Sequence, residues 1–188
     1  IVRDRGDFFT SLNRAIEDVE GSVCLDIGAN IGYWSLALNK FLDRKKIIIC
    51  FEPEKENLSV LSYNLKNEKN ITILQLGLGN AVEDIALGMP KYTLKRGGEH
   101  AQNTGNISVY NHQSNVCSRF TLVDLVLRGV AKPKEKVFLI KIDVEGFEYE
   151  VVKGMEACLK RDRPVVVLEI NPTTQILSGY DLSSILNI

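Results

Sequence analysis

Three acidic residues stand at the ends of short apolar runs that have the length of buried β-strands. Asp26, Glu52 and Asp143 each lie in or directly after such a run. Because open α/β sheets bind ligands at the carboxyl ends of their parallel strands, we expect the three carboxylates to converge on one rim. Clustered negative charge suits a cationic ligand and suits a pyrophosphate poorly. The sequence therefore predicts a binding site for a small cationic molecule.

A glycine-containing turn follows the first of these runs. Gly28, Asn30 and Gly32 separate a strand-like segment from a helix-like segment. Glycine permits a positive φ and a close approach of ligand to backbone, and asparagine tolerates the left-handed region better than most residues. A helix that begins after such a turn offers free N–H groups to a ligand. Glu52, which lies 26 residues after Asp26, is placed to accept hydrogen bonds from the ribose hydroxyls of an adenosine.

Short apolar segments alternate with segments of helical periodicity along most of the chain. Repeated β-α-β units imply a mostly parallel sheet with helices on both faces, which is a Rossmann-like three-layer α/β sandwich. Residues 81–120 break this alternation, and we expect a long excursion with one or two short strands, such as 107–110. The expected strands are 22–27, 46–51, 71–76, 137–142 and 164–170, and the expected helices are 31–42, 54–67, 149–160 and 182–186.

Length and composition limit the functional classes. A chain of 188 residues favours one domain spanning 1–188, and a formal net charge of −1 gives no overall attraction to nucleic acid or to an anionic membrane. No apolar run reaches the roughly 18 residues of a membrane span. The four cysteines form no CxxC pair, so we expect free thiols in a reducing, cytoplasmic setting. With two histidines and no CxxC pair, no metal site is expected.

These motifs resemble the FkbM-type branch of the class I methyltransferases that use S-adenosyl-L-methionine (SAM). The resemblance covers about residues 23–188 and implies SAM as cofactor and transfer of a methyl group to an oxygen, often on a sugar or another natural-product-like small molecule. In such methyltransferases the sheet normally ends with two strands beyond the counterpart of 164–170, so we expect the C-terminal strands to be truncated here. The resemblance rests on DIGANIGYWS, CFEPEKENLSVLSYNL, LGLGN, TLVDLV, IKIDVEGFEYEVVKGM and VVVLEIN.

The resemblance also suggests roles for individual residues. Gly77 stands in the LGLGN segment, where the family commonly has Ala-Leu-Gly-Asp, and it is predicted to contact the cofactor. An alcohol acceptor must lose a proton, so a general base is expected. Because Asp143 is assigned to the cofactor, Glu145 and His100 are the predicted catalytic residues. Residues 103–105 resemble a family segment near the site, and the excursion 81–120 is expected to form part of the acceptor pocket.

Two other functions remain open from the sequence. The first is an NAD-dependent oxidoreductase with an atypical glycine turn, although the chain lacks the full G-x-G-x-x-G pattern. The second is a non-catalytic relative that binds SAM or a partner protein through the same fold. The predicted partner is a small-molecule acceptor, for which a carbohydrate is one candidate, and neither nucleic acid nor membrane is expected.

Overall fold

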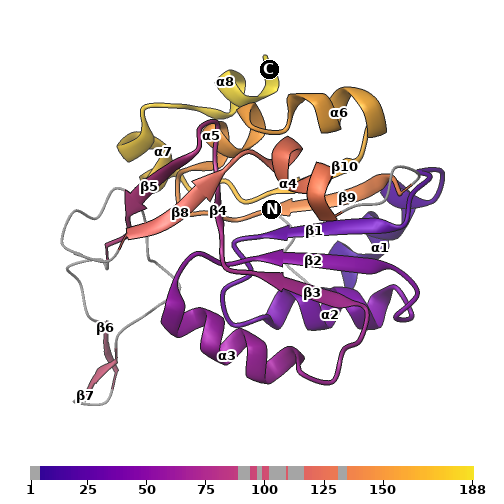
Figure 1. Ribbon diagram of the computed structural model, residues 1–188, viewed down its shortest axis with the longest axis horizontal. Coiled ribbons are helices and arrows are strands. Elements are labelled where there is room, and N and C mark those ends of the chain that lie inside the picture. Colours follow the sequence, from indigo (N-terminus) through magenta and orange to yellow (C-terminus); the bar gives the residue numbers. More distant parts are fainter. Residues whose placement is uncertain (1–4, 89–93, 97–98, 102–108, 110–116, 131–134) are drawn as a thin grey trace.

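The computed structural model describes residues 5–88, 94–96, 99–101, 109, 117–130 and 135–188 (Figure 1). Its centre is a five-stranded sheet with the order β10-β9-β1-β2-β3, in which all neighbouring strands run parallel. The strands are β1 (Val23–Ile27), β2 (Ile47–Phe51), β3 (Ile71–Leu74), β9 (Val137–Ile142) and β10 (Val165–Leu168). The predicted mostly parallel α/β fold is confirmed, and these strands follow the expected segments closely.

Both faces of the sheet are covered, which explains why the central strands are apolar throughout rather than alternating. Every residue of β1 and of β9 is buried. Successive side chains of a strand point to opposite faces. Cys24 accordingly belongs to one apolar cluster and Leu25 to the other. The two clusters are the two halves of the core.

The helices divide between the two faces. One core cluster joins the sheet to α1 (Arg5–Ile16), α2 (Tyr33–Phe41) and α3 (Lys55–Leu65), through residues such as Leu12, Leu38 and Leu61. The other joins it to α4 (Val123–Val130), α5 (Glu148–Lys153) and α6 (Glu156–Asp162), with contacts from Ile185 near the chain end. The short helices α7 (Pro172–Ser178) and α8 (Leu182–Leu186) complete the described chain. Helix α8 was expected, whereas α1 and α7 were not.

The predicted helix 149–160 is in fact two helices, α5 and α6, separated at Gly154 and Met155. Backbone packing accounts for the break. An added Cβ on Gly154 would lie 1.9 Å from the carbonyl oxygen of Gly79, so the chain approaches its neighbour too closely for a side chain. The carboxylate of Asp124 then accepts hydrogen bonds from the N–H groups of Ala157 and Cys158, which stabilises the first turn of α6.

The described part of the excursion and the residues just before it form a second, smaller sheet with the order β4-β8-β5. Its strands are β4 (Gly77–Leu78), β5 (Glu83–Ala86) and β8 (Cys117–Thr121). A hairpin of β6 (Leu94–Arg96) and β7 (Glu99–Ala101) lies apart from both sheets (Figure 1). Of the expected strand 107–110, all but Val109 lies outside the described residues.

Two further expectations concern the chain as a whole. All four cysteines are free thiols, as predicted, and three of them are buried. Among the described residues, no helix has the length and apolar character that a membrane span requires.

Candidate active site

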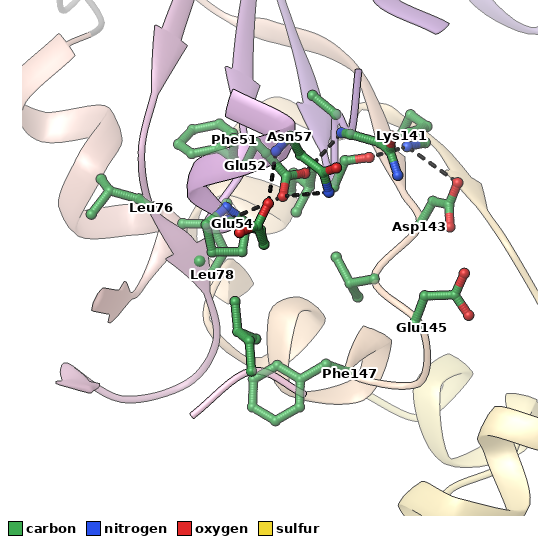
Figure 2. Close-up of a pocket in the computed structure, with 18 of the residues that line it drawn as sticks. Phe51, Glu52, Glu54, Asn57, Leu76, Leu78, Lys141, Asp143, Glu145 and Phe147 are labelled. Atoms are coloured by element: carbon green, nitrogen blue, oxygen red, sulfur yellow. Dashed lines mark hydrogen bonds and ion pairs between the residues drawn. The ribbon is translucent and has the colours of Figure 1, made fainter. Parts of the chain in front are cut away.

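A cavity of about 420 Å³ lies at the carboxyl ends of β1, β2 and β9 (Figure 2). Its wall includes the turn after β1, the acidic residues that follow β2 and β9, and an apolar side from the small sheet. The predicted site residues Gly28, Asn30, Glu52, Gly77 and Asp143 all line it, as does Glu145. The structure therefore brings together most of the residues selected from the sequence.

The turn after β1 has the conformation that its glycines indicated. Gly28 and Gly32 have φ values of 76° and 86°, and Asn30 has a φ of 51°. An added Cβ on Gly28 would lie 1.8 Å from the carbonyl oxygen of Asp143, so this position admits no side chain. The N–H groups of Gly28 and Ala29 both donate to the carbonyl of Phe51 at 3.1 and 3.0 Å. These bonds join the turn to the end of β2.

Glu52 is held at the cavity wall by the backbone around it. One carboxylate oxygen accepts from the Asn30 N–H at 2.8 Å, and the other accepts from the Glu54 N–H at 3.1 Å and from the Asn57 amide at 3.4 Å (Figure 2). The residue is only 5% exposed, and burial raises the pKa of its carboxyl group although these donors oppose the shift. Since a carboxylate offers about four acceptor positions, Glu52 can still accept from a ligand hydroxyl.

Asp26 occupies a different place from the one expected. It is fully buried and is not among the residues that line the cavity. Its carboxylate accepts a short hydrogen bond from the Ser35 hydroxyl and forms a 3.2 Å ion pair with the Lys141 ammonium. Because Lys141 lies opposite Asp26 in the register of β1 and β9, the lysine offsets the charge of the aspartate. Only two of the three predicted acidic groups thus face the cavity.

Sequence reasoning did not select Lys141, although a charged residue inside the apolar run of β9 is a visible signal. Its ammonium lies 3.4 Å from Asp143 and donates to the Gly28 carbonyl oxygen at 2.7 Å, in addition to its pair with Asp26. Burial alone would lower the pKa of Lys141, but the two carboxylates outweigh it and raise that pKa. The lysine is therefore an ammonium in the folded protein.

Asp143, Glu145 and Glu169 form a group of three carboxyl groups at the rim, with oxygens that lie within 4.8 Å of one another. Burial, then the charges of Asp143 and Glu148, raise the pKa of Glu145 to about 7. A hydrogen bond with Asp143, followed by burial, raises the pKa of Glu169 to about 8. Three carboxylates this close do not all ionise readily, so Glu145 and Glu169 lose their protons at a higher pH than ordinary carboxyl groups.

The backbone conformation at Glu145 places this residue at the cavity. Glu145 has a φ of 52°, a left-handed conformation that is uncommon outside glycine and clusters at functional sites. Glu148 supports the turn by accepting hydrogen bonds from the N–H groups of Val144 and Gly146. Glu169, which the sequence reasoning also missed, follows β10 directly. An acidic residue after the apolar run VVVL could have revealed it.

The apolar side of the cavity comes from β4, β8 and the turn before α5. Phe120 and Phe147 meet edge to face, with ring centroids 5.6 Å apart. A Cβ on Gly77 would lie 2.4 Å from the Phe120 ring, which explains the glycine at this position. Leu87 and Val109 of the excursion also line the cavity, so part of the expected acceptor segment does reach it.

His100 and residues 103–105 cannot be placed in the same way. The structure describes the backbone of His100 in β7, opposite Lys95, but not its side chain. Residues 103–105 lie outside the described residues. The role of His100 as a base stays a prediction from the sequence.

Comparison with known proteins agrees with this geometry. Residues 26–182 match the family model of the methyltransferase FkbM domain. The chain belongs to the FkbM methyltransferase family. This membership favours SAM over the NAD-dependent alternative.

Two curated relatives and one solved structure are similar to this FkbM domain. The hexuronic acid methyltransferase AglP of Haloferax volcanii is 27% identical over 89% of the chain, and methyltransferase 1 of Beauveria bassiana is 25% identical over 73% of it. The chain spans 66% and 59% of these two relatives. The crystal structure of a methyltransferase FkbM from Methylobacillus flagellatus superposes with a TM-score of 0.58 at 18% identity, covering 89% of this chain and 37% of that one. This last likeness supports the fold alone.

The residues of the cavity fit SAM, the cofactor that membership of this family implies. Glu52 has acceptor positions for ribose hydroxyls, and the Gly28 turn lines the same cavity. Leu76, Leu78 and Phe120 provide an apolar wall for an adenine ring. Asp143 faces the cavity with a side chain that is 39% exposed, which suits a sulfonium or an ammonium group.

Proposed function

We propose that this FkbM domain transfers a methyl group from SAM to a hydroxyl oxygen of a carbohydrate. The observation that carries the proposal is the position of the carboxyl groups of Asp143, Glu145 and Glu169 on the same cavity as the Gly28 turn and Glu52. One part of the cavity suits a cationic nucleoside cofactor, and the adjacent part can accept a proton from an alcohol. The name of AglP, a hexuronic acid methyltransferase, supports a sugar as the acceptor class.

The proposed mechanism assigns separate tasks to the residues of the chain. SAM, when bound, supplies an electrophilic methyl group on its sulfonium. Glu52 would accept hydrogen bonds from the ribose, and Asp143 would face the positive charge of the cofactor. Glu145 would accept the proton of the acceptor hydroxyl when the methyl group passes from sulfur to oxygen, since its pKa of about 7 leaves it partly ionised at neutral pH. Much of the acceleration comes from holding the two substrates in line.

The proposal also covers the extent of the domain and the setting in which the protein acts. We infer that residues 1–188 act as one methyltransferase domain, because both helix layers pack on the same central sheet. We also propose a reducing, cytoplasmic setting, which the four free thiols support.

A transfer assay tests the function directly. The domain would be incubated with methyl-labelled SAM and three acceptor classes, namely glycosides of a hexuronic acid, neutral hexosides and non-carbohydrate alcohols. We expect label on the carbohydrates, in an ether that NMR places on a ring oxygen, and loss of transfer in Glu145→Gln. Binding of SAM without transfer to any class would favour the non-catalytic alternative. Label in a methyl ester of the uronic acid would exclude a hydroxyl as the acceptor.

A further inference from the structure

We infer that Lys141 is a positioning residue, whose ammonium holds the glycine turn and Asp143 in a fixed relation to each other. The inference rests on the proposed function, because the two elements it joins are the cofactor part and the acceptor part of the same cavity. It gives a task to a residue that lies within the IKIDVEGFEYEVVKGM motif but to which the sequence analysis assigned no role.

The ammonium of Lys141 contacts three oxygen atoms. Its Nζ lies 2.7 Å from the carbonyl oxygen of Gly28, 3.2 Å from Asp26 and 3.4 Å from Asp143. The contact with Gly28 is a hydrogen bond, and the other two are ion pairs. The side chain is only 7% exposed. A buried ammonium with three such contacts holds its partners in place.

The partners of Lys141 come from three neighbouring pieces of backbone. Asp26 lies opposite it in the register of β1, Gly28 begins the turn after β1, and Asp143 directly follows the end of β9. Lys141 is the second-last residue of β9, so it lies at the strand end beside the turn and Asp143. Figure 2 shows the resulting link from Lys141 to Asp143 at the cavity. Loss of the ammonium would free the Gly28 carbonyl and the Asp143 carboxylate together.

Charge balance provides a second consequence that can be measured. The positive charge of Lys141 lies beside Asp26 and Asp143 and also acts on Glu145, a site where Glu148 and Glu169 add further acidic groups. Its charge lowers the pKa of Glu145 against the effects of burial and of the neighbouring carboxylates. Without the Lys141 ammonium, ionisation of Glu145 would require a higher pH.

The chain contains a suitable control lysine. Lys46 also donates to a glycine carbonyl, that of Gly21, at 2.6 Å. It lies just before β2, at the amino end of the sheet, and is remote from the cavity. Replacing either lysine by methionine removes a similar ammonium and a similar bond, so a difference between the two variants reports the location and not the loss of a lysine as such.

The experiment uses an Asp26→Asn background, because methionine at position 141 would otherwise leave a buried aspartate without its ion pair. Asp26→Asn, Asp26→Asn/Lys141→Met and Lys46→Met are compared by thermal unfolding, by calorimetry with S-adenosylhomocysteine and by the pH dependence of methyl transfer. We expect the double variant to unfold cooperatively, to bind at least tenfold more weakly than Asp26→Asn, and to have its pH–rate midpoint raised by about one unit. Lys46→Met should bind as the unmodified domain does.

Three results would overturn the inference. A double variant that binds within twofold of Asp26→Asn and keeps the same pH–rate midpoint would make Lys141 only a counter-charge for Asp26. A double variant that does not fold would make the lysine a requirement of the core. An equal loss of binding in Lys46→Met would make the effect general. If the unmodified domain itself fails to bind S-adenosylhomocysteine, the proposed function is refuted first, and the two failures are thereby distinguished.

Discussion

The backbone N–H of Asn30 donates a 2.8 Å hydrogen bond to Oε2 of Glu52, which joins the turn after β1 to the end of β2. Asn30 has a φ of 51° in the same turn in which Gly28 lies beside Asp143. One carboxylate therefore stabilises the shape of the turn and also faces the cavity. The cofactor part of the site is a connected unit, and changes in it are expected to act together.

Gly28→Ala tests whether the close approach at the turn is required. The substitution places a Cβ 1.8 Å from the Asp143 carbonyl oxygen at a φ of 76°, so we expect the free energy of unfolding to fall by about 2 kcal/mol or more. Gly179→Ala is the matched control, since Gly179 has a φ of 75° but an added Cβ there would meet no neighbouring atom of the described residues within 4 Å. Chemical denaturation of both variants separates the steric clash from backbone strain. Equal losses would show that the approach to Asp143 is unimportant.

The three carboxyl groups at the rim, those of Asp143, Glu145 and Glu169, predict a characteristic pH dependence of methyl transfer. Glu145 must be ionised to accept a proton, and its pKa of about 7 together with the pKa of about 8 of Glu169 means that lower pH protonates the group. Methyl transfer should therefore rise with pH through this interval and level off above it. The midpoint belongs to the group as a whole and not to one residue.

Substitutions at Glu169 and Glu145 separate the contributions of these two carboxyl groups to the pH–rate profile. Glu169→Gln removes the carboxyl group with the higher pKa, so titration near pH 8 is lost and the midpoint of the pH–rate profile should move to lower pH. Glu145→Gln should reduce kcat by about 100-fold or more, with little change in cofactor affinity. A pH–rate profile that is flat in the unmodified domain, or that neither substitution changes, would show that these carboxyl groups take no part in the reaction.

Chelation tests whether the same three carboxylates act with a metal ion. Oxygen ligands at this spacing can hold a hard cation. The ammonium of Lys141 lies 3.4 Å from Asp143, and its positive charge opposes the binding of a divalent cation beside it. We predict that methyl transfer is unchanged after extensive treatment with EDTA. Loss of transfer that added magnesium restores would reassign Asp143, Glu145 and Glu169 as metal ligands.

The strand ends could be predicted well because they depend on local sequence. Apolar runs of fixed length located β1, β2 and β9, and the residue after a run locates a side chain at the cavity rim. Asp26 and Lys141 could not be assigned in this way. Whether Asp26 faces a ligand or the interior depends on what stands opposite it on β9, and β9 is more than 100 residues away in the chain. The break between α5 and α6 likewise depends on a distant contact with Gly79.

The excursion is expected to contribute to acceptor binding. Leu87, Val109 and Phe120 of this segment line the cavity, and its remaining residues are rich in Gly and Asn. Replacing residues 99–106 with a short Gly-Ser linker should abolish methyl transfer while the affinity for SAM falls by less than about tenfold, or roughly 1.4 kcal/mol. Transfer that survives the replacement would show that 99–106 does not build the acceptor site. Loss of both activities with the fold intact would place the segment in the cofactor pocket.

The central claim is that the cavity at the ends of β1, β2 and β9 binds SAM, and calorimetry with S-adenosylhomocysteine tests it most directly. We predict saturable binding to the unmodified domain, no binding of NAD, and a loss of about 1.5–3 kcal/mol in Glu52→Ala because the ribose loses its charged acceptor. Glu56→Ala, an exposed neighbour in the first turn of α3, should bind as the unmodified domain does. Binding of NAD in place of S-adenosylhomocysteine, or an affinity that Glu52→Ala leaves unchanged, would contradict the account.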